Sequence, residues 1–172
     1  MRILGIDFGD SRTGIAISDP LGWTAQGLET ASGGMNAAAV RIAQLAHQYN
    51  VKTIVVGYPL NMNGSAGFRA ERTDSFIAAL KKQISKSGGN SEDSDNAGNS
   101  AGGAEIIKWD ERLSTAEAAR ALRSAGAKQP LRGAREKGKL DIVAASIILQ
   151  SYLDSIDSIN RTDSSPSEGE QL

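Results

Sequence analysis

The chain has no cysteine among its 172 residues and only one histidine, His47. The lack of cysteine excludes a disulfide framework, a thiolate nucleophile and a cysteine-ligated zinc ion, and it is compatible with a reducing compartment. His47 falls on the polar face of a helix predicted over residues 35–49, so we expect it to be exposed and exclude acid-base catalysis by histidine. Chemistry that uses carboxylates and metal ions needs neither residue and stays open.

Long apolar runs are also missing. The start of the chain has one basic residue and a short apolar run before Asp7, which is not the pattern of a signal peptide. No later apolar run approaches the roughly 20 residues needed to span a bilayer. We therefore expect a cytoplasmic protein without a membrane partner, folded as a single globular domain with a proper core.

The net charge of −1 conceals an uneven distribution. Residues 87–103 hold three acids and no base, and residues 154–172 hold five acids and one base. The rest of the chain has 18 bases and 12 acids, a net charge of +6. This part is positive enough to suit a nucleic-acid partner.

Two segments have compositions that cannot build a core. Residues 87–103 contain no aliphatic side chain larger than alanine, and residues 156–172 are rich in serine and acids. Such segments do not bury enough apolar surface to offset the entropy of ordering. We predict one domain over residues 1–155 with a disordered insertion at 87–103, followed by a disordered tail at 156–172.

The apolar patterns predict an α/β fold. Alternating patterns indicate an antiparallel meander of three strands at the N-terminus, and continuous β-branched runs indicate two buried parallel strands. Helical spacing follows several of these strands. The expected strands cover residues 3–7, 13–18, 23–30, 53–57 and 104–109, and the expected helices cover residues 35–49, 67–85 and 114–125 and a last segment that begins at Asp141. This order predicts a mixed five-stranded sheet with helices on both faces.

Three carboxylates fall where such a sheet places its functional crevice. Asp7 ends the first strand between glycines, and Glu111 follows the fifth strand, so both lie at the carboxyl ends of parallel strands. Asp141 starts a helix that can approach them. Three converging carboxylates repel one another unless hard cations such as Mg²⁺ or Mn²⁺ neutralise them. Two such ions about 4 Å apart can activate a water and stabilise the leaving oxygen in a displacement at phosphorus.

Each carboxylate also has a simpler interpretation. Asp7 can open the turn that follows its strand, and Glu111 can be an exposed turn residue. Asp141 can be an ordinary helix N-cap that the helix dipole favours. The shared position of the three residues supports a common site more than any one of them does.

Basic residues near this edge are candidates for phosphate contacts. Arg69 and Arg72 lie in the first turns of the helix at 67–85, where cations oppose the helix dipole. An anionic ligand would explain them, and a solvated basic face is the simpler alternative. Asn61 is a candidate polar contact at the crevice. The full set of basic candidates is Arg12, Arg69, Arg72, Arg112, Arg132, Arg135, Lys137 and Lys139.

Four segments together resemble the YqgF/RuvX family. They are Gly5-Ile6-Asp7-Phe8-Gly9, the sequence VGYPLN at 56–61, the sequence DERLST at 110–115, and LDIVAA with ILQ within 140–150. The resemblance implies a ribonuclease H-like fold shared with Holliday-junction resolvases. It also implies a bacterial cytoplasmic nuclease that processes the 5′ end of pre-16S rRNA, with Asp7, Glu111 and Asp141 as metal-binding catalytic carboxylates.

Our leading hypothesis is a metal-dependent hydrolase of structured RNA, with phosphate contacts that give affinity without sequence choice. The same site could instead resolve branched DNA, which a symmetric homodimer would favour, whereas a monomer would favour RNA. A nucleic-acid-binding or transcription-associated module without catalysis is a third possibility. Residues 7–14 also resemble the phosphate-binding turn of the sugar kinase, actin and Hsp70 superfamily, whose members need a second domain for which this chain is too short.

Overall fold

The sheet is built outward from the first strand in the sequence. β1 (Ile3–Phe8) pairs antiparallel with β2 (Arg12–Ser18), which pairs antiparallel with β3 (Ala25–Ser32). On its other side β1 pairs parallel with β4 (Thr53–Tyr58), which pairs parallel with β5 (Glu105–Asp110). The order β3-β2-β1-β4-β5 confirms the predicted mixed sheet, with β1 at its centre.

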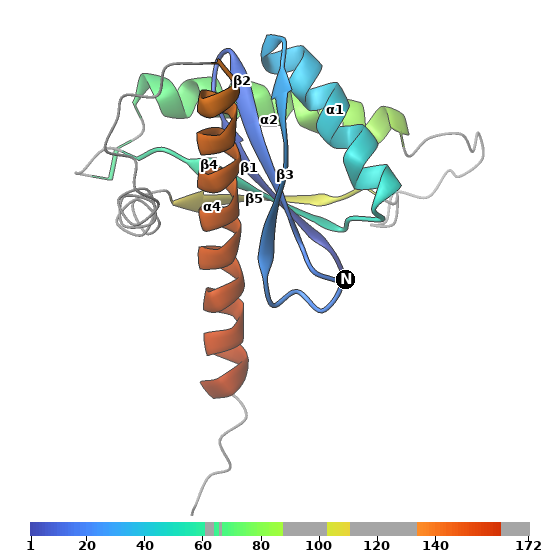
Figure 1. Ribbon diagram of the computed structural model, residues 1–172, viewed down its shortest axis with the longest axis vertical. Helices are drawn as coiled ribbons and strands as arrows, with labels where there is room; N and C mark the ends of the chain where they lie inside the picture. The colour runs from blue at the N-terminus through green and yellow to red at the C-terminus, as the bar shows by residue number, and fades with distance from the viewer. Residues whose placement is uncertain (61–63, 66, 88–102, 111–133, 163–172) are drawn as a thin grey trace, which may run out of the picture.

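Helices cover both faces of this sheet, as predicted (Figure 1). α1 (Gly34–Gln48) and α2 (Phe68–Ser87) lie together on one face, and α4 (Ala134–Thr162) crosses the other. The computed structural model describes residues 1–60, 64–65, 67–87, 103–110 and 134–162, without the side chains of 87, 134–137 and 160–162. The helix predicted at 114–125 and residues 88–102 of the predicted insertion lie outside the described residues.

The face under α1 and α2 carries the larger part of the core. Alternate residues of the strands point to this side, and large aliphatic side chains occupy those positions. They pack against apolar residues of both helices, and Phe76 of α2 is completely buried. The main members are Leu4, Ile6, Ile15, Ile17, Ile54 and Val56 from the strands, Ile42 and Leu45 from α1, and Phe76 and Leu80 from α2.

The face under α4 is lined by small residues instead. Gly5, Gly14 and Gly27 lie on β1, β2 and β3, and a Cβ atom at any of them would overlap atoms of α4. At Gly14 the overlapping atom would be the backbone carbonyl oxygen of Asp141. The helix therefore packs with its backbone close to the strands, over a smaller apolar cluster of Ala16, Val55, Ala145, Ile148, Leu149 and Leu153.

α4 is longer than the sequence pattern predicts at both ends. It begins at Ala134, so the expectation that Asp141 starts the helix and could act as its N-cap is wrong. Residues 134–137 are alanine, arginine, glutamate and lysine, all of which favour helix. The next residue, Gly138, is tied to β3, because its carbonyl accepts a hydrogen bond from Thr30 Oγ1 at 2.8 Å. The helix also continues to Thr162, past residue 156, where we expected the folded domain to give way to the tail.

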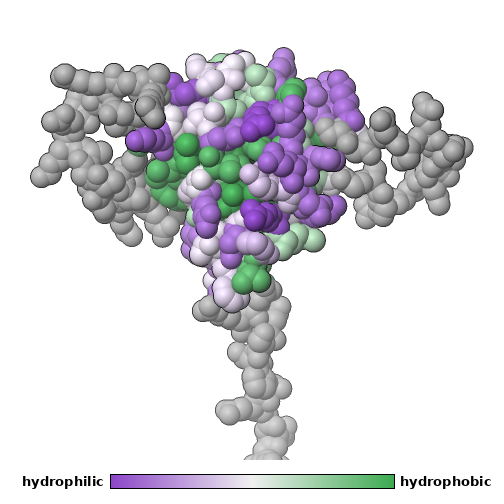
Figure 2. Space-filling view, turned by 45° about the vertical axis from the view of Figure 1, so that its right-hand side comes forward, coloured by the Kyte–Doolittle hydropathy of each residue, from purple (hydrophilic) through white to green (hydrophobic). Residues whose placement is uncertain are grey.

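Part of α4 has the length and composition of a membrane span, which we did not expect from the sequence. Within the described residues this is the segment Gly138–Ile159. In the fold one side of this segment packs against β1, β2 and β3. On the face drawn in Figure 2, hydrophilic residues border a hydrophobic area near the middle.

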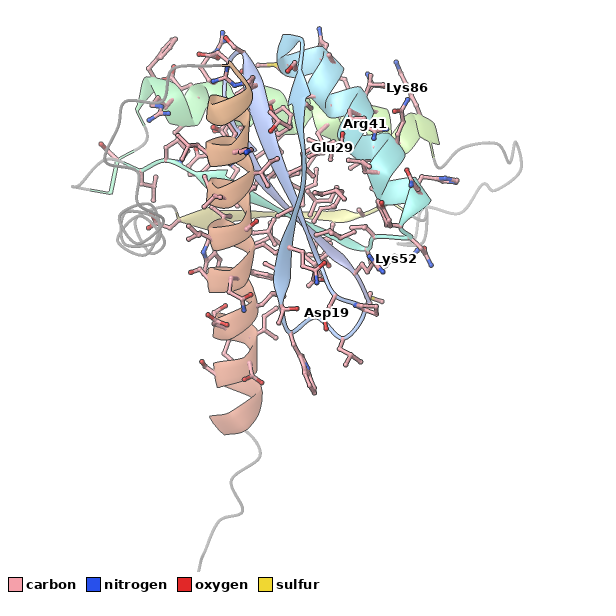
Figure 3. The ribbon with its side chains drawn as sticks, in the orientation of Figure 1. Asp19, Glu29, Arg41, Lys52 and Lys86 are labelled. Carbon is pink, nitrogen blue, oxygen red and sulfur yellow. The ribbon has the colours of Figure 1, made fainter. Side chains whose placement is uncertain are left out.

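An ion pair fastens α1 to the outer strand of the meander. Arg41 of α1 donates from Nε and Nη2 to the two carboxylate oxygens of Glu29 on β3, at 2.6 and 2.7 Å (Figure 3). These hydrogen bonds and the charge of Arg41 hold the pKa of Glu29 below its ordinary value, against the opposing effect of partial burial. His47, near the end of the same helix, is exposed as predicted.

Candidate active site at the carboxyl end of β1

Strand register brings the carboxyl ends of β1, β4 and β5 to one edge of the sheet. Ile6 of β1 pairs with Val56, and Tyr58 at the end of β4 pairs with Asp110 at the end of β5. Asp7 follows Ile6 in β1 and therefore lies at this edge of the sheet, where it is half-buried. The next residue after β5 is Glu111, which lies outside the described residues.

Gly14 is a neighbour of both Asp7 and the backbone of Asp141. It pairs with Asp7 across the antiparallel β1–β2 ladder, and its Cα lies against the backbone carbonyl of Asp141 in α4. A side chain at position 14 would push α4 away from the strand. Two of the three residues predicted as catalytic are thus far apart in the sequence, but both are neighbours of Gly14 near the end of β1.

Asp141 has a basic partner in this arrangement. Arg12 Nε, on the first residue of β2, donates to Asp141 Oδ2 at 2.8 Å. The side chains of Arg12 and Asp141 are 32% and 26% exposed, so the pair is partly screened from water. We predicted that Arg12 contacts phosphate. In the structure its guanidinium donates a hydrogen bond to Asp141, one of the three predicted catalytic carboxylates.

No group of three histidine, cysteine, aspartate or glutamate side chains is close enough to hold a metal ion among the described residues. The predicted third carboxylate, Glu111, is not one of those residues. The two described carboxylates offer only oxygen ligands, which is the donor type that Mg²⁺ and Mn²⁺ prefer.

Apart from Arg12, the residues predicted to contact nucleic acid fall into three groups. Arg72 Nε and Nη2 both donate to Asp10 Oδ1, at 3.0 and 2.5 Å, so this guanidinium already has an acidic partner. Arg69 and Lys139 are exposed. Asn61, Arg112 and Arg132 lie outside the described residues, and the side chains of Arg135 and Lys137 in α4 are not described.

The sequence reasoning missed a hollow of about 50 Å³ beside this edge. Its lining includes Phe8 and Gly9, directly after Asp7, together with Pro59 and the first residues of α2. Phe68, the first residue of α2, has a relative exposure of 72%. The sequence signal for this hollow was Phe68 itself, which stands between a glycine and an arginine. A single aromatic residue in a sequence does not indicate whether its side chain is buried or exposed.

Beside the hollow, a polar cluster ties the end of β4 to α2. Tyr58 Oη donates to Asp74 Oδ2 at 2.9 Å, and Lys108 Nζ lies 2.5 Å from Asp74 Oδ1 and 4.5 Å from the centre of the Tyr58 ring. The hydrogen bond from Lys108 holds the pKa of Asp74 below its ordinary value. Burial, followed by the bond to Asp74, raises the pKa of Tyr58. The cluster fixes the strand end that carries Pro59.

Comparison with known proteins identifies the chain. Residues 1–155 match the family described as RuvX, Holliday junction resolvase. The chain belongs to the RuvX family. It is 46% identical over 158 residues to a Ruminiclostridium cellulolyticum protein named as a pre-16S rRNA nuclease, covering 91% of this chain and 96% of that protein. An Acetivibrio thermocellus protein of the same name is 45% identical, covering 90% and 96%.

Solved structures extend the likeness to the fold. Thermus thermophilus RuvC superposes with a TM-score of 0.52 at 14% identity, covering 90% of this chain and 96% of RuvC. A structure of T. thermophilus RuvC in complex with a Holliday junction substrate gives a TM-score of 0.51 at the same identity. This RuvX-family chain therefore has the ribonuclease H-like fold of the resolvases, as its sequence resemblance implied.

Proposed function

We propose that this protein is a divalent-metal-dependent nuclease that hydrolyses phosphodiester bonds of structured RNA, with Asp7, Glu111 and Asp141 as its catalytic carboxylates. The observation that carries the proposal is the contact of Gly14 with the backbone of Asp141, because Gly14 is the strand partner of Asp7. Half-burying carboxylates at one strand end is costly unless cations or hydrogen bonds offset the lost hydration. Divalent cations would stabilise both carboxylates in addition to the hydrogen bond that Asp141 accepts from Arg12.

Mg²⁺ or Mn²⁺ fits the donor set of this site. Asp7 and Asp141 supply carboxylate oxygens, and Glu111, the residue after β5, is the third ligand in our proposal. A divalent ion held by these residues would supply an activated water and would stabilise the leaving oxygen in a displacement at phosphorus. Arg12 holds the Asp141 carboxylate in place through its 2.8 Å hydrogen bond.

The relatives with the higher sequence identity favour RNA over branched DNA as the substrate. Relatives that cover nine-tenths of the chain at 45–46% identity carry the name of a pre-16S rRNA nuclease. The likeness to RuvC, at 14% identity, concerns the fold alone. We therefore propose processing of the 5′ end of pre-16S rRNA in the bacterial cytoplasm, with a monomer as the acting form.

The test is cleavage of a labelled 5′ fragment of pre-16S rRNA beside a four-way DNA junction, with Mg²⁺, with Mn²⁺ and with chelator. We expect metal-dependent cleavage of the RNA, lost in Asp7→Asn because the amide removes one charged ligand. Asp19→Asn is the matched control, since Asp19 lies in the β2–β3 turn and asparagine keeps its oxygen acceptor.

Each other outcome removes part of the proposal. Cleavage of the DNA junction alone replaces RNA processing with resolution. Undiminished cleavage by Asp7→Asn overturns the carboxylate assignment. If the wild-type protein binds the RNA but cleaves it under none of the metal conditions, the protein is a nucleic-acid-binding module without catalysis.

A further inference from the structure

We propose that Phe68 and Arg69 form a binding site for an unpaired RNA base and its neighbouring phosphate, beside the carboxylates of β1 and α4. This inference deepens the proposed function, on which it rests for the identity of the ligand. It names the substrate class more closely: RNA that is single-stranded next to the bond that is cut.

The exposure of Phe68 is the starting observation. Its relative exposure is 72%, whereas Phe76 of the same helix is fully buried. A single exposed apolar residue is common on protein surfaces and does not by itself indicate a site. What distinguishes Phe68 is the hollow that it borders.

The hollow offers a rigid apolar wall to a flat ligand. Phe8 lines it and is held in place by a parallel stack on Phe76, with ring centres 4.3 Å apart and planes 9° apart. Pro59, at the end of β4, lines it as well. Aromatic side chains of this kind stack on bases, and each stacked base contributes affinity without sequence choice.

Charge around the hollow favours a phosphate group. Arg72 forms an exposed ion pair with Asp10, which offsets its charge. The guanidinium of Arg69 makes no ion pair or hydrogen bond with another described residue, and it also lines the hollow. An aromatic ring beside an arginine suits an unpaired nucleotide, because a base inside a duplex is already stacked on its neighbours.

The position of the hollow ties it to the candidate active site. Consecutive residues of a strand point to opposite faces, so Asp7 lies on the α4 side while Phe8 lies on the α2 side. The carboxylate and the hollow therefore occupy the two sides of one strand end. An RNA strand that crosses this end can place a phosphate at Asp7 and the base of a neighbouring nucleotide at Phe68.

The test compares binding of a fluorescein-labelled 12-nucleotide single-stranded RNA and a blunt 12-base-pair RNA duplex, measured by anisotropy in chelator so that nothing is cleaved. We expect Phe68→Ala to weaken binding of the single strand about tenfold and to leave binding of the duplex unchanged. Phe68→Trp should restore the single-strand affinity. Trp23→Ala is the matched control, because Trp23 is 71% exposed but lies in the β2–β3 connection.

A spectroscopic readout separates stacking from a general loss of affinity. Stacking quenches 2-aminopurine, so a single strand containing this base should lose fluorescence on binding the wild-type protein and lose less on saturation with Phe68→Ala. Equal losses of single-strand and duplex affinity, unchanged affinity in Phe68→Ala, or no binding of the single strand overturns the proposal.

The two proposals can fail separately. Phe68-dependent binding by a protein that cuts no RNA keeps the base site and removes the nuclease function. Asp7-dependent cleavage with unchanged single-strand affinity in Phe68→Ala keeps the nuclease function and removes the base site.

Discussion

The two faces of the sheet hold their helices in different ways. Under α1 and α2, large aliphatic side chains and Phe76 fill the space between helix and strand. Under α4, Gly5 and Gly14 let the helix backbone approach β1 and β2 directly, and Gly27 leaves room for the Ile142 side chain on β3. Large buried side chains supply stability, because burial of apolar area is the main favourable term in folding. Small residues supply proximity, which the face with Asp7 and Asp141 needs.

The largest effect on stability should come from the aliphatic face. Leu80→Ala removes a fully buried side chain of α2 and should lower the free energy of unfolding by about 2–5 kcal/mol, measured by urea denaturation. Leu80 packs on the side away from Asp141, so cleavage per folded molecule should stay unchanged. Loss of cleavage in a sample that is still fully folded would show that the two faces are not independent.

Gly14→Ala should affect both stability and cleavage. The new methyl group would overlap the backbone of Asp141, so α4 must shift, at a cost of about 1–3 kcal/mol. The shift separates Asp141 from Asp7 and should lower the rate of RNA cleavage in samples confirmed to be folded by circular dichroism.

Gly138→Ala is the matched control for that prediction. A Cβ atom there would lie 3.5 Å from Thr30 Oγ1, an ordinary contact, and alanine inside a helix is favoured over glycine by about 0.5–1 kcal/mol. This variant should be as stable as the wild-type protein or more so, with normal cleavage. Equal damage by both substitutions would mean that any added methyl under α4 is harmful, whatever its place.

The smallest effect should come from the ion pair that joins α1 to β3. Glu29→Gln weakens a partly exposed pair and should lower stability by about 0.5 kcal/mol at pH 7. Because the folded pKa of Glu29 is lowered, the pair contributes above the ordinary value of 4.5 and loses its contribution as the pH falls through the lower folded value. Urea unfolding from pH 7 to pH 3 should show the two proteins converge at the acidic end. A difference that persists there would assign the effect to packing.

Local patterns were enough to predict the sheet. Continuous β-branched residues in β4 and alternation in β2 each indicated a strand, and the sequence order of the elements restricted how they could pair. The position of Asp7 at a strand end could be predicted for the same reason. These features depend on neighbours in the sequence.

The remaining features depend on contacts between distant residues. Arg12 and Asp141 are 129 positions apart, and nothing in either neighbourhood indicates that they form a pair. Gly14 appeared only as a small residue in a strand, because a missing side chain gives no sign of what approaches it. The start of α4 was predicted too late, since Gly138 and the basic residues around it indicated a loop.

The order of the elements along the chain affects when the protein can become active. β1, with Asp7, precedes α4 in the sequence, and α4 follows all five strands. During synthesis the meander can form early, but Asp141 reaches Gly14 only after α4 has left the ribosome and docked. A nascent chain therefore carries an incomplete set of carboxylates. On the proposed function, a ribosome that is making this nuclease is not exposed to its activity until α4 has been made.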